Sequence, residues 1–320
     1  MERKITLVAF MMATIFSIGL TSIPFSFADI SIDIGENFLT IDKGTSDDPS
    51  PFLRKVNPDT GVTIELVEVI VGGEDVLGGK GLAFNPVDGK LYALIKIDNG
   101  GPANDIFLAT LNPETGVATL IDDTLDKYQA IAFNSAGDLF GAVANNGNDF
   151  NTLQSMSIVD ASTTELCDLD GFSGRSLAFN PVDGFLYHYN VDVGLQRIVD
   201  TTTGAGNPCG SIDIPTTEPT EFSTALTFRT QTGVFLMGVD GTDLFTLSAA
   251  GTGPDFVGSI DVQPRGFAII LVDDIPIGGT YIPIDQTALL LAGVQSISMW
   301  MIPVVVAAIG IGVFVIKRRK

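Results

Sequence analysis

The chain repeats one pattern of apolar and polar positions. Residues 81–94 read GLAFNPVDGKLYAL and residues 176–189 read SLAFNPVDGFLYHY, so that two short apolar runs flank a polar stretch. Asn-Pro and Asp-Gly are typical of tight turns, because Pro presets φ and Gly accepts positive φ. Weaker copies occupy residues 130–143 and 225–238, and a degenerate start lies at residues 266–269. The pattern predicts a β-hairpin at each copy.

A second, weaker pattern between the hairpins predicts another pair of strands. Residues 52–56 and 62–71 flank Asn-Pro-Asp-Thr-Gly, and residues 106–111 and 117–121 flank Asn-Pro-Glu-Thr-Gly. A complete repeat therefore holds four strands, and all-strand repeats of roughly 40–50 residues are typical of β-propeller blades. Thinner versions of the pair lie at residues 153–159 with 163–169, 195–199 with 209–214, and 244–247 with 256–262.

The order of these strands predicts how a ring would close. The repeats begin with the second half of a unit and end with the first half. Residues 29–41 alternate polar and apolar positions, as a strand with one buried face does. N-terminal strands paired onto the last hairpin would complete a blade and protect its edges. We expect an all-β propeller of about five four-stranded blades; an irregular sixth blade through residues 29–41, or an open solenoid, is the alternative.

The two ends of the chain predict export and membrane anchoring. Residues 5–20 are almost wholly apolar, and Ser26 and Ala28 are small residues at the positions that a signal peptidase requires. Residues 297–316 contain no charge and match a bilayer core in length as a helix. The basic residues that follow at once predict a cytoplasmic end under the positive-inside rule.

These observations divide the chain into five parts. We expect a signal helix over residues 1–28, cleaved ahead of Asp29, and an extracellular propeller over residues 29–281. A linker over residues 282–296 then leads to a single transmembrane helix over residues 297–316 and a cytoplasmic tail over residues 317–320. An uncleaved signal anchor is the alternative at the N-terminus.

Two stretches of the sequence resemble known groups. The repeated phrase NPxTG…LAFNPxDGxLYAL, over residues 52–272, resembles the repeats of exported propellers of the YVTN/NHL-like and quinoprotein-like groups. Residues 282–320, IPIDQTALLLAGVQSISMWMIPVVVAAIGIGVFVIKRRK, resemble the C-terminal anchor of exported surface proteins of ammonia-oxidising archaea. The first resemblance implies a propeller fold, and the second implies a location in the archaeal cell envelope.

The charge of the chain is strongly negative, at −21 over 320 residues. Its two ends hold six of the 17 basic residues and one of the 38 acidic residues, which leaves 11 basic and 37 acidic residues, a net of −26, between them. So acidic a body repels nucleic acid, and we expect no nucleic-acid partner. The acids either form a solvated outer surface or hold divalent cations in part.

Turns rich in Asp and Asn follow the second strand of most repeats. Propeller topology places equivalent turns on one rim, where their oxygens are ligands of the kind that calcium prefers. Plain turns use the same residue types, and the sequence has no EF-hand spacing. We therefore expect calcium, if it binds, at Asp98, Asn104, Asp105, Asn148 and Asp149.

Cys167 and Cys209 are the only cysteines. In an exported protein an even pair predicts a disulfide. Both are expected in the last strand of neighbouring repeats, and the outer strands of adjacent blades can stand farther apart than the ~4.4–6.8 Å that a disulfide allows between Cα atoms. The sequence leaves the pairing open.

No motif identifies a catalytic centre. The sequence contains no Gly-x-Ser-x-Gly and no phosphate-binding loop, and its single histidine, His188, is expected to be a partly exposed strand residue. We expect a non-enzymatic, membrane-anchored cell-surface propeller that acts as a binding or structural module of the envelope, with an unknown extracellular partner. The alternative is an extracellular, glycosidase-like hydrolase that uses paired carboxylates in the central channel.

Overall fold

The computed structural model describes residues 36–44, 51–98, 105–143, 147, 149–169, 176–190, 193–216, 223–239 and 241–271. The chain divides into two compact units, Met1–Ile275 and Pro276–Lys320, and all of the described residues belong to the first. No helix long and apolar enough to span a membrane occurs in these described ranges. The predicted signal helix, linker, transmembrane helix and tail lie outside them.

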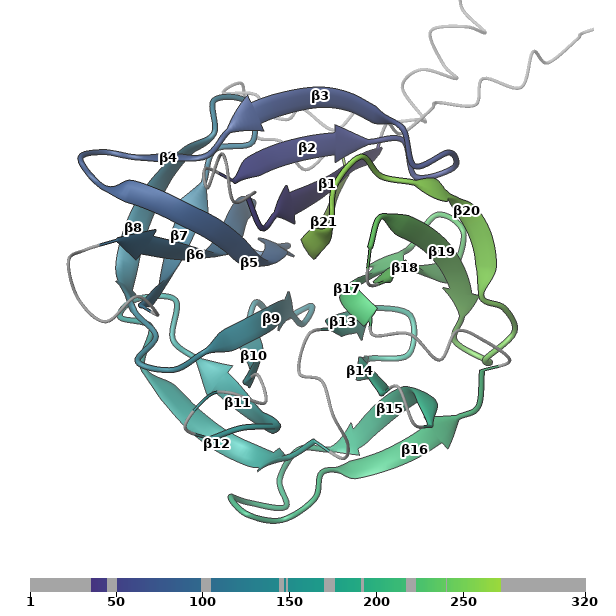
Figure 1. Cartoon of the computed structure of the whole chain (residues 1–320). Coiled ribbons are helices and arrows are strands. Elements are labelled where there is room, and N and C mark those ends of the chain that lie inside the picture. The colour runs from purple at the N-terminus through teal and green to yellow at the C-terminus, as the bar shows by residue number, and fades with distance from the viewer. Residues whose placement is uncertain are drawn as a thin grey trace, which may run out of the picture. The chain divides into compact units, whose positions relative to one another are not determined.

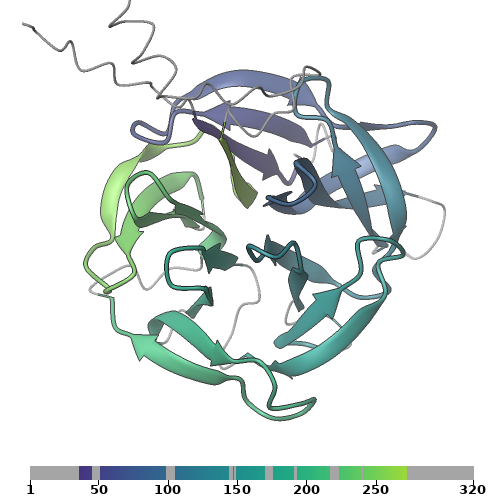
Figure 2. The ribbon, with the colours of Figure 1, turned by 180° about the vertical axis from the view of Figure 1, so that it is seen from behind.

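Strands of the first unit form five sheets around a common centre, each with four antiparallel strands (Figures 1 and 2). We number these sheets as blades in chain order of their outer strands, and the first strand of each blade is the innermost. Blade 1 is β21 (Pro264–Leu271), β1 (Glu36–Asp42), β2 (Phe52–Val56) and β3 (Thr63–Glu68); blade 2 is β5 (Asp75–Asn85), β6 (Lys90–Asp98), β7 (Ile106–Leu111) and β8 (Val117–Asp123), with β4 (Ile70–Val71) on its outer edge; blade 3 is β9 (Tyr128–Phe133), β10 (Leu139–Val143), β11 (Thr152–Met156) and β12 (Thr163–Asp168); blade 4 is β13 (Leu177–Asn180), β14 (Phe185–Asn190), β15 (Gly194–Asp200) and β16 (Gly210–Ile214); blade 5 is β17 (Ser223–Arg229), β18 (Val234–Val239), β19 (Asp243–Ser248) and β20 (Asp255–Ser259).

The ring closes through the first blade, as the sequence predicts. β1 pairs antiparallel with β21, from Glu36 opposite Leu271 to Asp42 opposite Pro264. The last described strand is therefore the innermost strand of a blade whose other three strands come from the N-terminal end. Five blades are confirmed, so the open solenoid and the sixth blade are wrong. β1 begins at Glu36, and the earlier part of the predicted strand over residues 29–41 lies outside the described ranges.

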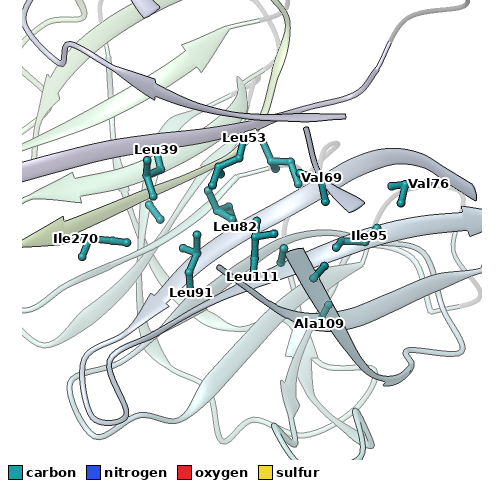
Figure 3. Packing of buried hydrophobic residues seen from close by; sticks show 14 of the residues in the cluster. Leu39, Leu53, Val69, Val76, Leu82, Leu91, Ile95, Ala109, Leu111 and Ile270 are labelled. Atoms are coloured by element: carbon teal, nitrogen blue, oxygen red, sulfur yellow. The ribbon is translucent and has the colours of Figure 1, made fainter. Parts of the chain in front are cut away.

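Apolar layers between neighbouring blades hold the ring together. Because alternate side chains of a strand point to opposite faces, each blade contributes to two layers. Leu82 packs toward blade 1, beside Leu39 and Leu53, whereas its neighbour Ala83 packs toward blade 3. Figure 3 shows the first of these layers. Apolar positions of the repeated hairpins thus pack between the blades.

Close contacts on the outside of the ring come from the turns between third and fourth strands. Each of these turns approaches the outer strand of the preceding blade. Gly116, with φ +70°, lies so close to β3 that an added Cβ would stand 1.9 Å from the carbonyl oxygen of Glu68. Gly61 likewise approaches β20, where an added Cβ would stand 3.1 Å from the backbone nitrogen of Ser259. Glycine in the Asn-Pro-x-Thr-Gly turn therefore permits both the backbone conformation and the approach.

Candidate functional site

The five innermost strands surround a central cavity of about 260 Å³. It lies toward the side of the ring that carries the turns between first and second strands, which we call the hairpin face; the opposite side is the loop face. Pro86, Ser135, Pro181 and Thr230 of those turns line its mouth, together with Leu271. Two positions of every inner strand line the wall: Leu82, Ile131, Leu177, Leu226 and Phe267 at one, and Phe84, Phe133, Phe179, Phe228 and Ile269 at the other.

The described wall of this cavity carries no ionisable side chain. Its polar groups are only Asn134, Ser135, Thr227 and Thr230. Asn134 is already engaged, since its Oδ1 accepts from the backbone N–H of Ala136 at 2.9 Å. A glycosidase needs two carboxyl groups facing one site. Among the described lining residues, the cavity does not supply that pair.

His188 is buried, which corrects the expectation of a partly exposed residue. It is 0% exposed, and its Nδ1–H donates to the carbonyl oxygen of Ser176 at 2.8 Å. Its side chain lies on the same face of β14 as Leu186, which packs in the layer toward blade 3. Burial lowers the pKa of His188 below its ordinary value. The imidazole is therefore neutral at neutral pH, and its Nε2 is buried without a hydrogen-bond partner among the described residues.

The predicted calcium ligands are only partly described. Asp98 ends β6, Asp105 directly precedes β7, and Asp149 lies in the connection to β11, so all three belong to the loop face. Asn104 and Asn148 lie outside the described ranges. No group of three or more His, Cys, Asp or Glu side chains in the described part of the chain is placed to hold a metal ion.

One neighbouring acid was missed by sequence reasoning. Asp75 of β5 stands directly opposite Asp98 in the β5–β6 ladder. Like charges at opposite positions of an antiparallel pair are unfavourable. The register between the two strands, which includes two irregularities, brings them together and could not be deduced from the spacing of the acids along the chain. Calcium binding at this rim stays a prediction.

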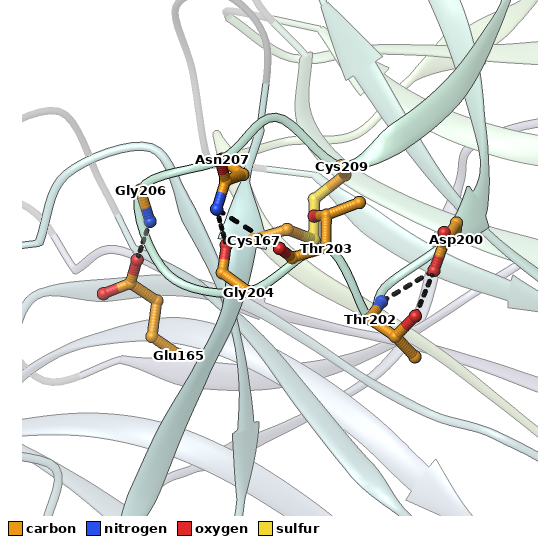
Figure 4. Close-up of a disulfide and its surroundings, with 9 residues drawn as sticks. All are labelled: Glu165, Cys167, Asp200, Thr202, Thr203, Gly204, Gly206, Asn207 and Cys209. Atoms are coloured by element: carbon orange, nitrogen blue, oxygen red, sulfur yellow. Dashed lines mark hydrogen bonds between the residues drawn. A yellow bond between two sulfur atoms is a disulfide. The ribbon is translucent and has the colours of Figure 1, made fainter.

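Cys167 and Cys209 form a disulfide between blades 3 and 4 (Figure 4). Their Cα atoms are 4.9 Å apart. The distance is short because Cys209 lies just before β16, in a loop that reaches over to the preceding blade, rather than in an outer strand. The backbone N–H of Asp168 donates to the carbonyl oxygen of Asn207, and that of Gly204 donates to Leu166, at 2.8 and 2.9 Å.

An ion cluster on the hairpin face joins the two blades at the closure. The guanidinium of Arg229, at the end of β17, donates through Nε to Glu36 and through Nη1 to Asp59 at 2.5 Å. Glu36 and Arg229 are nearly buried, whereas Asp59 is exposed. Sequence reasoning missed this cluster. Its signal is the Arg after Leu-Thr-Phe, where three other hairpins have Asn85, Asn134 and Asn180.

Comparison with known proteins yields structural likeness only. No family model matches the chain, and no curated protein matches its sequence. A chain of a nidogen/laminin complex is 13% identical with a TM-score of 0.47, and the match covers 74% of this chain and 99% of that one. Virginiamycin B lyase from Staphylococcus aureus is 12% identical with a TM-score of 0.38, covering 72% and 77%. TolB from Acinetobacter baumannii is 12% identical with a TM-score of 0.44, covering 71% and 54%. Scores and identities this low carry no inference about ligand or activity.

Proposed function

We propose that this chain is a membrane-anchored β-propeller displayed outside the cell, where it acts as a non-enzymatic binding or structural module of the envelope. The observation that carries this proposal is the centre of the ring. In enzymes, reactive groups gather in a concave site, with ionisable side chains among them. Here the described wall of the central cavity is apolar or uncharged throughout.

The disulfide supports export. Disulfides persist in oxidising surroundings outside the cell and are rare in reducing cytosol. Cys167 and Cys209 are both buried and joined across two blades, and the described residues contain no free cysteine. A pair placed in this way contributes to the stability of the fold only where it forms, which fits an exported body.

The chain ends supply the second support. The apolar stretch over residues 5–20 and the uncharged stretch over residues 297–316, followed by four basic residues, are typical of a signal and a stop-transfer anchor. The acidic body between them suits display next to water. Its charge would keep neighbouring copies apart and limit non-specific association.

Cell fractionation tests the location. We expect the full chain to stay with membranes after alkaline carbonate washing and to be cleaved by protease added to intact cells. A variant that ends at residue 296 should be released into the medium with its disulfide formed. Recovery of the full chain from the cytosol, or protection of the body from external protease, would contradict the proposal.

A separate assay tests the non-enzymatic role. Full chain in washed membranes is incubated with envelope polysaccharides and aryl glycosides, with membranes lacking the chain as the control. We expect no release of sugar or aryl alcohol above that control. Turnover that scales with the amount of chain would favour the hydrolase alternative, and its acids would then have to be sought outside the central cavity.

A further inference from the structure

The central cavity narrows at its end on the loop face. The residue before the first lining position of each inner strand is small: Gly81, Ala130, Ser176, Ala225 and Gly266. Neighbouring inner strands approach closely there, since a Cβ added at Gly266 would stand 2.8 Å from the Cα of Gly81. The space between the strands falls to about 10 Å³ at this level, which is barely enough for one water molecule. The cavity therefore has a floor, and a ligand would enter from the hairpin face.

Aromatic side chains form a belt in the wall above this floor. Phe84, Phe133, Phe179 and Phe228 occupy the same position of four inner strands, and Ile269 occupies it in the fifth. Aromatic rings that meet in offset or edge-to-face arrangements are stabilised beyond the effect of burial alone. The belt therefore favours an aromatic ring over an aliphatic chain as the occupant.

The volume of the cavity suits a single ring. Dry cavities of about 150 Å³ that are lined by Leu, Ile and Phe accept benzene. The central cavity has the same kind of lining and a volume of about 260 Å³. It therefore has room for one benzene ring that carries small substituents.

The polar groups of the wall indicate which substituents fit. The described wall has no ionisable side chain, and Arg265 lines the narrow space at the floor rather than the cavity itself. Because burial of an unpaired charge is costly, we expect a neutral ligand. Among the described lining residues of the inner strands, Thr227 is the one with a polar side chain. The other four strands have alanine at this position: Ala83, Ala132, Ala178 and Ala268.

We propose that the central cavity binds a small, neutral, single-ring aromatic molecule with one hydroxyl group, of the class of simple phenols, and that this group hydrogen-bonds to Thr227. Burial of the ring against the apolar wall supplies affinity in proportion to the area removed from water. The hydroxyl of Thr227 can donate or accept and would fix the orientation of the ring. The inference rests on the binding role given under Proposed function and deepens it by naming the class of ligand and the site.

Equilibrium dialysis of the full chain in lipid nanodiscs tests the site. The probes are para-cresol, its isostere para-xylene, in which a methyl group replaces the hydroxyl, and the anion para-toluate. Nanodiscs without the chain correct for partition into lipid. We expect saturable binding of both neutral probes, at one site per chain, and roughly a hundredfold weaker binding of para-toluate. Absence of saturable para-cresol binding, or para-toluate binding of similar affinity, overturns the proposal.

Substitutions of Thr227 make the result specific to the cavity. Thr227→Val removes the hydroxyl at nearly constant size, so the affinity for para-cresol should fall roughly three- to tenfold and that for para-xylene should not fall. Thr227→Phe places a ring in the cavity and should abolish binding of both. Thr110→Val, on β7 and outside the cavity, is the matched control and should bind like the parent chain.

Each variant has an outcome that contradicts the proposal. Unchanged para-cresol affinity in Thr227→Val overturns the hydrogen bond, and unchanged affinity in Thr227→Phe overturns the site. If Thr227→Phe does not fold, the contrast between Thr227→Val and Thr110→Val still decides. External protease scores surface display separately, and mass spectrometry of the recovered para-cresol scores conversion. Specific binding without display, or with conversion, supports the site and contradicts Proposed function, whereas display without binding overturns the site alone.

Discussion

Glycines in the outer turns determine how closely neighbouring blades approach. Gly116 combines φ +70° with a backbone contact that leaves no room for a side chain. Gly184 has φ +79° in a turn on the hairpin face, but nothing lies within 4 Å of a Cβ built there. Both belong to repeated turn motifs, so the sequence alone explains each glycine only by the turn in which it lies. Only the structure shows that Gly116 also contacts the preceding blade.

The pair Gly116→Ala and Gly184→Ala tests this distinction. Gly184→Ala should cost about 1–2 kcal/mol of unfolding free energy, the cost of a left-handed conformation for a residue with a Cβ. Gly116→Ala should cost about 2–4 kcal/mol, because its Cβ would also displace β3 from β8. Denaturant unfolding of the two variants measures the difference. Equal losses would mean that the outer contact yields at little cost.

His188 links a single side chain to the pH dependence of stability. Burial lowers the pKa of His188 in the folded chain. Below about pH 6.5 the unfolded chain therefore binds a proton at this residue, whereas the folded chain binds it only at lower pH. The contribution of His188 is therefore present above that pH and is lost as pH falls through it. Met237 stands opposite Leu226 as His188 stands opposite Leu177, which makes methionine a fitting replacement.

We expect His188→Met to flatten the stability profile between about pH 6.5 and 5 relative to the parent chain. Above pH 7 the two proteins should differ by no more than about 1 kcal/mol, since one hydrogen bond to Ser176 is exchanged for apolar packing. Denaturant midpoints measured every half unit of pH give the comparison. Parallel profiles for parent and variant would show that His188 does not titrate differently on unfolding.

At the scale of strands, the sequence predicts the features that depend on the local pattern of residues. β2 and β7 have the predicted bounds, and the inner hairpins and the closure onto β21 follow from alternation, turn residues and repeat order. Contacts between blades could not be predicted, since they depend on where a loop folds back. The loop before Cys209 pairs with β12, and Arg229 joins Glu36 across 193 residues of chain.

The disulfide should act as a link between two such elements. Cys167→Ala/Cys209→Ala removes a cross-link that closes a separation of 42 residues, and we expect a loss of about 2–4 kcal/mol of unfolding free energy. The variant should remain folded, since the two blades still share their apolar layer. Denaturant unfolding under non-reducing conditions measures the loss. Reduction of the parent chain is the matched control and should produce a similar loss. If neither the substitutions nor reduction lowers the unfolding free energy, the loop before Cys209 stays paired with β12 without the disulfide, and the prediction is wrong.

At the scale of the whole molecule, the excess of negative charge is a property that neither strands nor turns explain. The body carries a net charge of −26 between residues 5 and 316, because its 37 acidic residues far outnumber its 11 basic residues. Most of its acids therefore cannot be paired with a basic side chain. The acidic surface and the expected repulsion of nucleic acid follow from composition alone. Which acids meet, as Asp75 and Asp98 do, depends on strand register and was not predictable.

Self-repulsion of this size predicts a stabilising effect of salt. Raising sodium chloride from about 0.1 M to about 1 M shortens the screening length from about 10 Å to about 3 Å, so the folded body should gain roughly 3–8 °C in thermal midpoint. Millimolar calcium separates screening from binding. If repulsion alone acts, calcium and magnesium at equal ionic strength should raise the thermal midpoint by the same amount. A further gain specific to calcium, present in 1 M salt and lost in Asp105→Ala, would instead identify an ion held by the loop face. A midpoint that falls as sodium chloride is added would contradict the prediction, because it would show that attractive ion pairs outweigh the repulsion among the excess acids.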